Sequence, residues 1–243
     1  MKNIFLLRVS KLIAALDSKH SLFALLRFGV LGSFEHKNIL LRQFKTIVDI
    51  GANRGQFSLA ARKYAPSAHI FSFEPLKIPA NIFRKIFLND KLTILHEVAI
   101  GPRESIVTMH ISAKDDSSSL LPISTAQTNH FPGTDEVGVA EIRVSTLDSF
   151  LGEQDLIGPA LLKIDVQGFE MEALQGCELM IDKFDFVYCE CSFIELYSGQ
   201  KLVHEVIDWL YQRHFYLIGI FNSSYDHAGQ AIQADFLFKQ EIS

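Results

Sequence analysis

Acidic residues stand at the carboxyl ends of the predicted strands, and their positions suit ligand binding and proton transfer. They are Asp49, Glu74, Glu97, Asp165 and Glu190. In a parallel sheet, ligands bind beyond these strand ends, near the point where the strand order reverses. Carboxylates placed there can accept hydrogen bonds from hydroxyls, attract a cation or take up a proton. The sequence therefore predicts one site built from several strand ends.

A glycine turn follows the first of these acids in the run "TIVDIGANRGQFSLA". Its glycines can take backbone angles closed to other residues and let a ligand approach the main chain. A dinucleotide turn has a further glycine that makes room for a pyrophosphate, but here Asn53 takes that place. The turn fits two phosphates poorly and fits the cationic S-adenosylmethionine better. The cofactor-binding residues predicted from it are Asp49, Gly51, Ala52, Asn53, Gly55 and Phe57.

The second and third strand ends suggest how the adenosyl part of such a ligand would be held. Glu74 follows the glycine turn at the sequence spacing, about 20 residues, at which a carboxylate commonly binds a ribose diol. Pro75 ends the strand at that point. The alternative for Glu74 is an ordinary solvated acid at a strand end. Glu97 and Val98 end the next strand, where the topology predicts that they lie against the adenine.

The fourth strand carries charge in an otherwise buried run, "LLKIDVQGFEMEALQG". Lys163 and Asp165 share one face of this strand, which is costly unless the charges are paired or used. One interpretation is a Lys163–Asp165 ion pair at the strand end. The other places Asp165 beside the methyl-accepting group, with Glu190 in the same position on the neighbouring strand.

The elements that must position these residues alternate along the chain from Thr46 onward. Strands alternating with amphipathic helices predict right-handed βαβ units on a mostly parallel sheet, which is an α/β fold. The last two strands lack an intervening helix, so we expect an antiparallel hairpin at one edge. The predicted sheet strands cover residues 46–50, 69–74, 92–100, 161–166, 184–190, 215–221 and 234–239. Residues 105–112 and 138–146 predict a β excursion around a polar loop.

The composition narrows the class of protein. The formal net charge of −5 gives no electrostatic footprint for nucleic acid, so we predict no nucleic-acid partner. Three cysteines without a disulfide spacing suggest a reducing compartment, and we expect a cytoplasmic protein. The scattered histidines show no metal-ligand spacing, and we predict no metal site.

The N-terminal residues 1–45 are predicted to form a helical cap on an S-adenosylmethionine-binding domain of residues 46–243. Charged residues interrupt the apolar residues here, so neither a transmembrane helix nor a signal peptide is expected. We expect this segment to pack on the main domain; a homodimer surface and peripheral membrane contact are the alternatives. The apolar positions that indicate amphipathic helices are Ile4, Leu7, Leu12, Leu16, Phe23 and Leu26.

In order and spacing, the segments "VDIGANRG", "FEP", "EVAIG", "DDSSSL", "STLDSF" and "KIDVQGFEMEALQG" resemble the FkbM-type methyltransferases. The resemblance covers about Thr46 to Lys239. It implies the class I methyltransferase fold, a Rossmann-like three-layer α/β/α sandwich whose seven-stranded sheet has an antiparallel last strand. It also implies S-adenosyl-L-methionine as cofactor and O-methylation of a sugar, glycan, glycolipid or secondary metabolite. One departure is Gln167, where the family segment usually has glutamate.

A hydroxyl acceptor must lose a proton, so the reaction needs a side chain that acts as general base. Asp165 is the first candidate, followed by Glu190 and then His227 in the last loop; Lys163 completes the set of catalytic candidates. For His227 the alternative is an ordinary surface histidine. Ser118, in the polar stretch "KDDSSSLLP", is predicted to contact the cofactor from a lid, the alternative being a flexible loop.

Two other functions remain open at this stage. The fold class alone permits an NAD-dependent oxidoreductase, and the sheet could belong to an inactive S-adenosylmethionine-binding protein. A nucleic-acid N-methyltransferase is disfavoured, because the fourth strand ends in "IDVQG" rather than an Asn/Asp-Pro-Pro-aromatic motif. The acceptor itself cannot be read from the chain.

Overall fold

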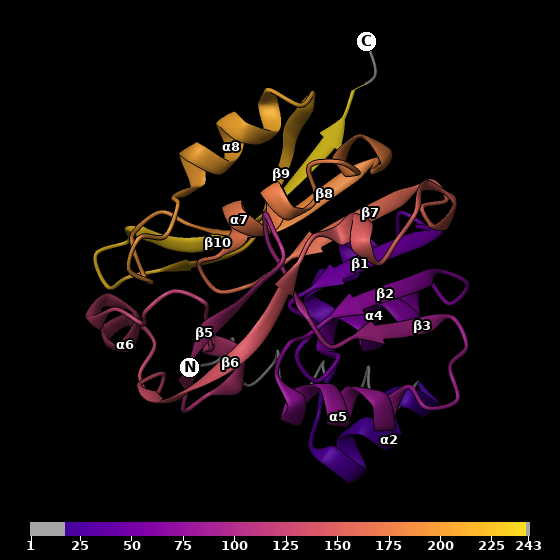
Figure 1. Ribbon diagram of the computed structural model, residues 1–243, viewed down its shortest axis with the longest axis horizontal. Helices are drawn as coiled ribbons and strands as arrows, with labels where there is room; N and C mark the ends of the chain where they lie inside the picture. The colour runs from indigo at the N-terminus through magenta and orange to yellow at the C-terminus, as the bar shows by residue number, and fades with distance from the viewer. Residues whose placement is uncertain (1–17, 242–243) are drawn as a thin grey trace.

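The computed structural model describes residues 18–241 of the 243-residue chain. Its main sheet has seven strands in the order β3-β2-β1-β7-β8-β10-β9 (Figure 1). The bounds are β1 Thr46–Ile50, β2 His69–Phe73, β3 Thr93–His96, β7 Ala160–Ile164, β8 Phe186–Ser192, β9 Phe215–Tyr225 and β10 Ala231–Gln240. β10 is antiparallel to both of its neighbours, and the other pairs are parallel. The predicted sheet is therefore confirmed, except that β10 lies inside it and β9 forms the edge.

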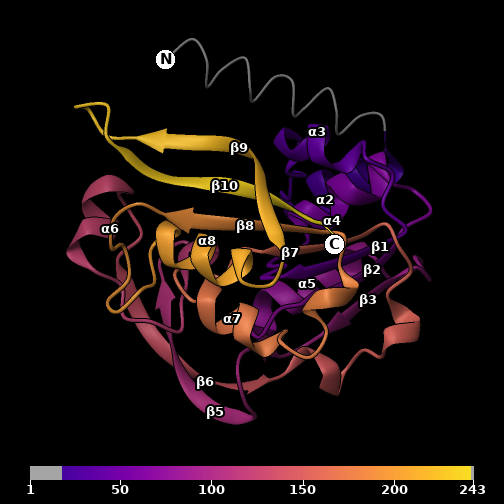
Figure 2. The same cartoon turned by 90° about the horizontal axis from the view of Figure 1, so that it is seen from above.

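Helices cover both faces of this sheet, giving the predicted three layers. Figure 2 shows α7 and α8 on one face and α2, α3 and α4 on the other. The helix bounds are α2 Lys19–Phe28, α3 Lys37–Leu40, α4 Gln56–Tyr64, α5 Lys77–Ile86, α6 Thr125–His130, α7 Glu170–Gly176 and α8 Val203–Tyr211. The 3₁₀ turns are η1 Phe34–His36, η2 Asp115–Ser117, η3 Leu147–Ser149, η4 Glu153–Asp155 and η5 Ile181–Lys183.

The alternation of side chains along β1 explains how one strand supports two cores. Val48 and Ile50 pack with residues of α7 and α8. Ile47 points to the opposite face and packs with residues of α3 and α4. Successive side chains of a strand point to opposite faces, so Asp49 shares the α4 side with Ile47. The strand thereby carries an acid into the interior beneath the glycine turn.

A second, three-stranded sheet has the order β4-β6-β5, with β4 Ala99–Ile100, β5 Ser105–Ser112 and β6 Glu136–Ser145. The predicted β excursion is thus present. The single strand predicted over residues 92–100 is wrong, because the chain leaves β3 after His96 and joins the second sheet at Ala99. The segment predicted as a polar loop between β5 and β6 also contains η2 and α6.

The described part of the N-terminal segment packs on the main domain. Ser18 caps α2, and Gly29 ends that helix in a left-handed conformation at φ 68°. Ala24 is buried against α5, whereas Phe23 and Leu26, expected on the packed face, are 46 % and 78 % exposed. The positions Ile4, Leu7, Leu12 and Leu16 lie outside the described residues. Within residues 18–241, no helix has both the length and the apolar character needed to cross a bilayer.

Candidate functional site

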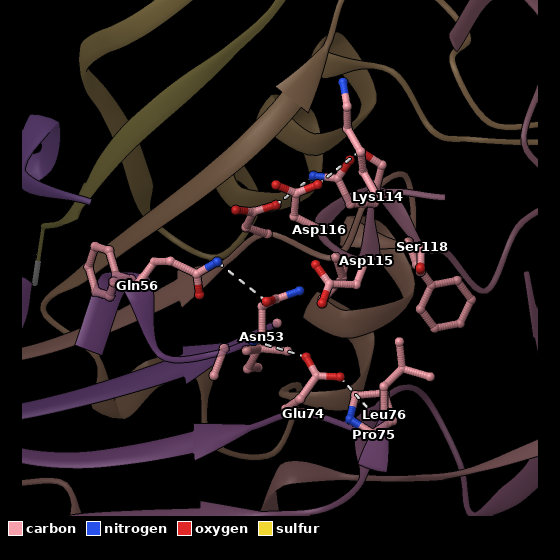
Figure 3. A pocket seen from close by; sticks show the side chains of 18 of the residues that line it. Asn53, Gln56, Glu74, Pro75, Leu76, Lys114, Asp115, Asp116 and Ser118 are labelled. Carbon is pink, nitrogen blue, oxygen red and sulfur yellow. Dashed lines mark hydrogen bonds between the residues drawn. The ribbon is translucent and has the colours of Figure 1, made fainter. Parts of the chain in front are cut away.

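A pocket of about 510 Å³ opens at the carboxyl ends of β1, β2 and β7. This is the switch point of the sheet, because the chain proceeds from β1 toward β2 on one side and from β7 toward β8 on the other. Most of its lining comes from the glycine turn, the ends of β2 and β7, and the excursion around η2. Figure 3 shows the side chains of Asn53, Glu74 and Asp115 converging on this space.

The two glycines of the turn are required for different reasons. Gly51 has φ 81°, and a Cβ there would lie 1.8 Å from the carbonyl oxygen of Asp165. No side chain fits this approach, so Gly51 allows β1 and β7 to meet at the pocket floor. Gly55 has φ 92°, and its Cβ would meet Phe87 and Phe83 at 2.8 and 2.9 Å. Gly55 does not line the pocket, and its close approach is to the aromatic side chains Phe83 and Phe87.

Glu74 lines the pocket directly beside the glycine turn and is 5 % exposed. One carboxylate oxygen accepts from the backbone N–H of Asn53 at 2.9 Å, and the other accepts from the N–H of Leu76 at 2.8 Å (Figure 3). Burial raises the pKa of Glu74 to about 7, although these two amides oppose the rise. Each carboxylate oxygen keeps a further acceptor site, so the group can still receive hydroxyl donors from the pocket.

Asp49 lies beneath the pocket rather than in its lining. It is 0 % exposed, accepts from the Ser58 hydroxyl at 2.9 Å and pairs with Lys163 Nζ at 3.1 Å. Lys163 also donates to the Gly51 carbonyl at 3.2 Å and lies 3.7 Å from Asp165. Burial alone would lower the pKa of Lys163, but Asp49 and Asp165 more than offset this and raise it. The pairing predicted for Lys163 thus includes Asp165, with Asp49 as the closer partner.

Asp165 and Glu190 are bridged by Gln167. The Gln167 side-chain amide donates to Asp165 at 2.8 Å and to Glu190 at 3.0 Å, while its oxygen accepts from the Tyr197 hydroxyl at 2.8 Å. Gln167 has φ 57°, a left-handed conformation that points its side chain back between the two acids. Burial, with Asp165 nearby, holds the pKa of Glu190 well above its usual range. Asp165 lines the pocket and Glu190 does not.

Glu97 and Val98, which the sequence predicted to lie against an adenine, do not line the pocket. Glu97 is exposed and pairs with Arg84 on α5 at 2.7 Å, and Val98 is buried outside the pocket lining. Because the chain changes sheets after His96, the next residues, Ala99 and Ile100, reach the pocket instead. An apolar wall surrounds that part of the space, formed by Leu76, Pro75, Ile100, Met109, Leu120 and Phe131.

The polar excursion closes one side of the pocket. Asp115 of η2 accepts from Arg54 Nε at 2.8 Å, which ties the excursion to the glycine turn. Ser119 donates to the Gln167 carbonyl at 2.5 Å, and the Tyr197 hydroxyl, which donates to the Gln167 side chain, also lies 3.2 Å from the Ser117 carbonyl. Ser118 lines the pocket, with its hydroxyl accepting from the N–H of Ser112. The segment is therefore anchored from several directions.

The histidine at the pocket is not the one that the sequence suggested. His227 lies exposed in the turn between β9 and β10 and does not line the pocket. His36, from the N-terminal segment, does line it. Its Nδ1 lies 2.9 Å from the Tyr188 hydroxyl and 3.7 Å from the Asp235 carboxylate. Among residues 18–241, no three His, Cys, Asp or Glu side chains gather closely enough to hold a metal ion.

A family model described as "Methyltransferase FkbM domain" matches residues 49–217, which include the glycine turn, Glu74 and the Asp165 segment. The chain belongs to the FkbM methyltransferase family. Its seven-stranded sheet, with β10 antiparallel between β8 and β9, gives this FkbM protein the class I methyltransferase fold.

Curated relatives of this FkbM methyltransferase are also methyltransferases by name. "2-O-methyltransferase NoeI" of Sinorhizobium fredii is 29 % identical over 180 residues, covering 71 % of this chain and 74 % of that protein. "Methyltransferase 1" of Beauveria bassiana is 28 % identical over 145 residues, covering 54 % and 58 %. Among solved structures, precorrin-6y C5,15-methyltransferase of Geobacter metallireducens matches with a TM-score of 0.46 and 11 % identity, covering 85 % of this chain and 88 % of that one.

The sequence located part of the pocket of this FkbM methyltransferase and missed part of it. Gly51, Ala52, Asn53, Phe57, Glu74, Pro75, Ser118, Lys163 and Asp165 all line the pocket. His36, Gln233 and all of the apolar wall except Pro75 were missed. Apolar residues of an excursion have no spacing that distinguishes pocket from core, and an isolated histidine carries no motif. Gln233 follows the last hairpin, so its strand position was the only available signal.

Proposed function

We propose that this protein is an S-adenosylmethionine-dependent O-methyltransferase acting on a hydroxyl of a sugar, glycan, glycolipid or secondary metabolite. The observation that carries the proposal is Glu74, a buried carboxylate that lines the pocket and accepts from the backbone of the glycine turn, in a chain of a methyltransferase family. Such a carboxylate can accept hydrogen bonds from both hydroxyls of a ribose. A pocket of about 510 Å³ is within the size range of small-molecule sites.

The residues present suit each part of this cofactor. Glu74 would accept from the ribose, and the apolar wall around Ile100 and Met109 would hold the adenine. The cationic amino-acid and sulfonium end would lie toward the Gly51 turn and Asp165. Asp49 and Lys163 would support that end from below, because their pairing fixes the carbonyl of Gly51.

The charge of the lining also favours a cationic ligand over a nucleotide with phosphates. Acidic residues outnumber lysines in it, with Glu35, Glu74, Asp115, Asp116 and Asp165 against Lys114 and Lys163. Like charges repel, so two phosphates would be disfavoured here, whereas a sulfonium and an ammonium are attracted. The NAD-dependent oxidoreductase is therefore the weaker alternative.

When bound, S-adenosylmethionine supplies a methyl group already attached to a good leaving group. The protein then has to align the acceptor oxygen with that methyl, and such positioning can lower a barrier by roughly 7–11 kcal/mol. It must also accept the hydroxyl proton, which is worth about 10²–10⁴-fold in rate. The polar lining near Asp165, which includes Gln56 and Gln233, can hydrogen-bond a polyhydroxylated acceptor. The name of the 2-O-methyltransferase relative supports a hydroxyl acceptor.

Binding and transfer assays test this function. We expect calorimetric titration to give saturable binding of S-adenosylmethionine and none of NAD. Incubation with methyl-labelled S-adenosylmethionine and fractionated carbohydrates, lipids and small metabolites should then label one fraction. Binding of NAD in preference would contradict the proposal, and tight donor binding without transfer to any fraction would support the inactive binding protein instead.

The ion pair between Arg54 and Asp115 yields a prediction for the lid. Asp115→Asn should weaken binding of S-adenosylmethionine by about two- to fivefold, because a partly exposed pair is worth up to about 1 kcal/mol. Calorimetric titration measures the effect. Glu104→Gln is the matched control, since it breaks the exposed pair with Arg143 far from the lining. Equal affinities in the two variants would remove the lid role of η2.

The remaining predictions about the protein's setting stay predictions. Cys177, Cys189 and Cys191 are free and buried, which suits the expected cytoplasmic location. The described N-terminal segment contributes Ser33 and His36 to the pocket, so we place residues 31–36 on the acceptor side as well as in the predicted cap. A homodimer and peripheral membrane contact remain alternatives for this segment.

A further inference from the structure

Four polar side chains from separate parts of the chain meet behind the pocket, and we call them the His36 cluster: His36, Tyr188, Asn222 and Asp235. Tyr188 donates its hydroxyl hydrogen to Asp235 at 3.0 Å, and Asn222 donates to the same carboxylate oxygen at 2.7 Å. His36 Nδ1 lies 2.9 Å from the Tyr188 oxygen. The His36 and Asp235 side chains are 15 % and 13 % exposed, whereas Asn222 lies at the exposed side of the cluster.

The tautomer of the His36 imidazole depends on where the hydrogen bonds of the cluster run, because Nδ1 faces both the Tyr188 oxygen at 2.9 Å and the Asn222 side-chain nitrogen at 3.3 Å. Tyr188 has one hydroxyl hydrogen, and it can donate this hydrogen either to Nδ1 or to the Asp235 carboxylate, which also accepts from Asn222. When Tyr188 donates to Asp235, the contact with the Tyr188 oxygen places the imidazole hydrogen on Nδ1. In the neutral ring this leaves a lone pair on Nε2. A role for His36 as a base requires this arrangement, in which Nε2 can accept a proton.

The ring is also held in place at the pocket. His36 lines the pocket, and its ring packs edge-on against Phe57 and Tyr188, with ring centroids 5.3 and 5.5 Å apart. Phe57 also lies beneath Lys163 Nζ, at 5.5 Å from the ring centre. His36 therefore stands on the same side of the pocket as Lys163, where the acceptor is expected.

The charges around His36 favour its neutral form near pH 7. Burial lowers its pKa, and Lys163 acts in the same direction. Asp235, Glu35 and Asp165 oppose this by raising it. The net direction is downward, so the ring is available as a base, while Asp235 can stabilise the imidazolium once a proton arrives.

The acids favoured by the sequence are less available. One oxygen of Asp165 accepts from Gln167, and the other faces Lys163 Nζ at 3.7 Å. Both oxygens of Glu190 accept from side-chain amides, those of Gln167 and Gln233, and Glu190 does not line the pocket. These contacts suit groups that position ligands rather than groups that remove a proton.

Resting on the proposed function, we propose that His36 is the general base of the transfer, with Tyr188 and Asp235 as positioning residues. The acceptor hydroxyl gives its proton to His36 Nε2 as its oxygen forms a bond to the methyl carbon. The carbon–sulfur bond breaks, and its electron pair goes to sulfur. S-adenosylhomocysteine and the methyl ether leave, and the imidazolium returns its proton to water.

Nuclear magnetic resonance of the full chain, labelled with ¹⁵N in its histidine rings, tests the prepared base without any ligand. The His36 signals are assigned by their loss in His36→Gln. We expect a neutral ring with its hydrogen on Nδ1 at pH 7.5, and a shift toward the Nε2–H form in Tyr188→Phe. A His36 ring that carries its hydrogen on Nε2 in the unsubstituted protein would overturn the proposal.

Transfer of labelled methyl to a panel of methyl glycosides supplies the kinetic test. His36→Gln should lower kcat by about 10²–10⁴-fold with donor affinity largely retained. His204→Gln, at an exposed position of α8, is the matched control and should transfer normally. Unchanged transfer by His36→Gln would overturn His36 as the base. Failure of the unsubstituted protein to bind the donor would contradict the proposed function instead, and the tautomer measurement would still stand.

Discussion

Replacing Glu74 with glutamine should weaken binding of S-adenosylmethionine by about 10- to 100-fold. A hydrogen bond to a charged group contributes roughly 1.5–3 kcal/mol, and glutamine removes the charge that would receive the ribose hydroxyls. The remaining amide oxygen can still accept from a backbone N–H, so the fold should persist. Calorimetric titration of both proteins at pH 8 measures the change.

The same residue predicts opposite pH dependences for binding and stability. Its pKa is about 7 in the folded protein against an ordinary value of 4.5. Donor binding needs the ionised form, so affinity should rise as pH increases through 7. Stability has the opposite pH dependence. Between pH 4.5 and 7 the unfolded chain releases this proton while the folded chain retains it, so the free energy of unfolding falls by up to about 3 kcal/mol as pH rises. Glu170, whose pKa burial also raises to about 7, adds to the loss of stability.

Glu97→Gln is the matched control for Glu74, because Glu97 ends the neighbouring strand but is exposed and outside the pocket lining. Its donor affinity and pH dependence should equal those of the unsubstituted protein. If Glu74→Gln also bound the donor normally, with the same rise between pH 6 and 8, the ribose role would have to be abandoned.

Lys163→Met should destabilise the fold by about 3–5 kcal/mol. Removing one partner of a buried pair leaves an uncompensated charge, and Asp49 is 0 % exposed with only the Ser58 hydroxyl as another hydrogen-bond donor. The substitution also frees the Gly51 carbonyl that Lys163 holds at 3.2 Å. Unfolding by urea, compared with the unsubstituted protein at pH 7, measures the loss.

The double variant Asp49→Asn/Lys163→Met provides the control. Without the buried carboxylate, it should recover a large part of the stability lost in Lys163→Met. Asp49→Ala should likewise act mainly on stability, since Asp49 does not line the pocket. A double variant that is no more stable than Lys163→Met would show that the loss has another cause.

The main sheet could be predicted because each of its strands has a local pattern that agrees with its place in the fold. The runs "TIVDI" and "ALLKI" are buried on both faces, and helices separate the parallel strands. The break after His96 could not be predicted, because no glycine or proline marks it. It arises from pairing between Ala99 and Val144, a contact between distant residues.

The pocket was predictable where function depends on backbone shape. Gly51 and Asn53 have left-handed backbone angles that the residue types themselves suggest. The position of Asp49 beneath the pocket could not be predicted, because its side of β1 depends on α4 and Lys163, which only the assembled fold brings together. His36 was missed for a related reason: its partners Tyr188 and Asp235 come from strands near the other end of the chain.

The most direct test of this account is a crystal structure of the protein with S-adenosylmethionine or its product S-adenosylhomocysteine bound. We expect the ribose hydroxyls within hydrogen-bond distance of the Glu74 carboxylate, the adenine against Ile100 and Met109, and the sulfur on the side of Asp165 and His36. Density for the ligand away from the Gly51 turn, or for a phosphate-bearing nucleotide within the pocket, would contradict it.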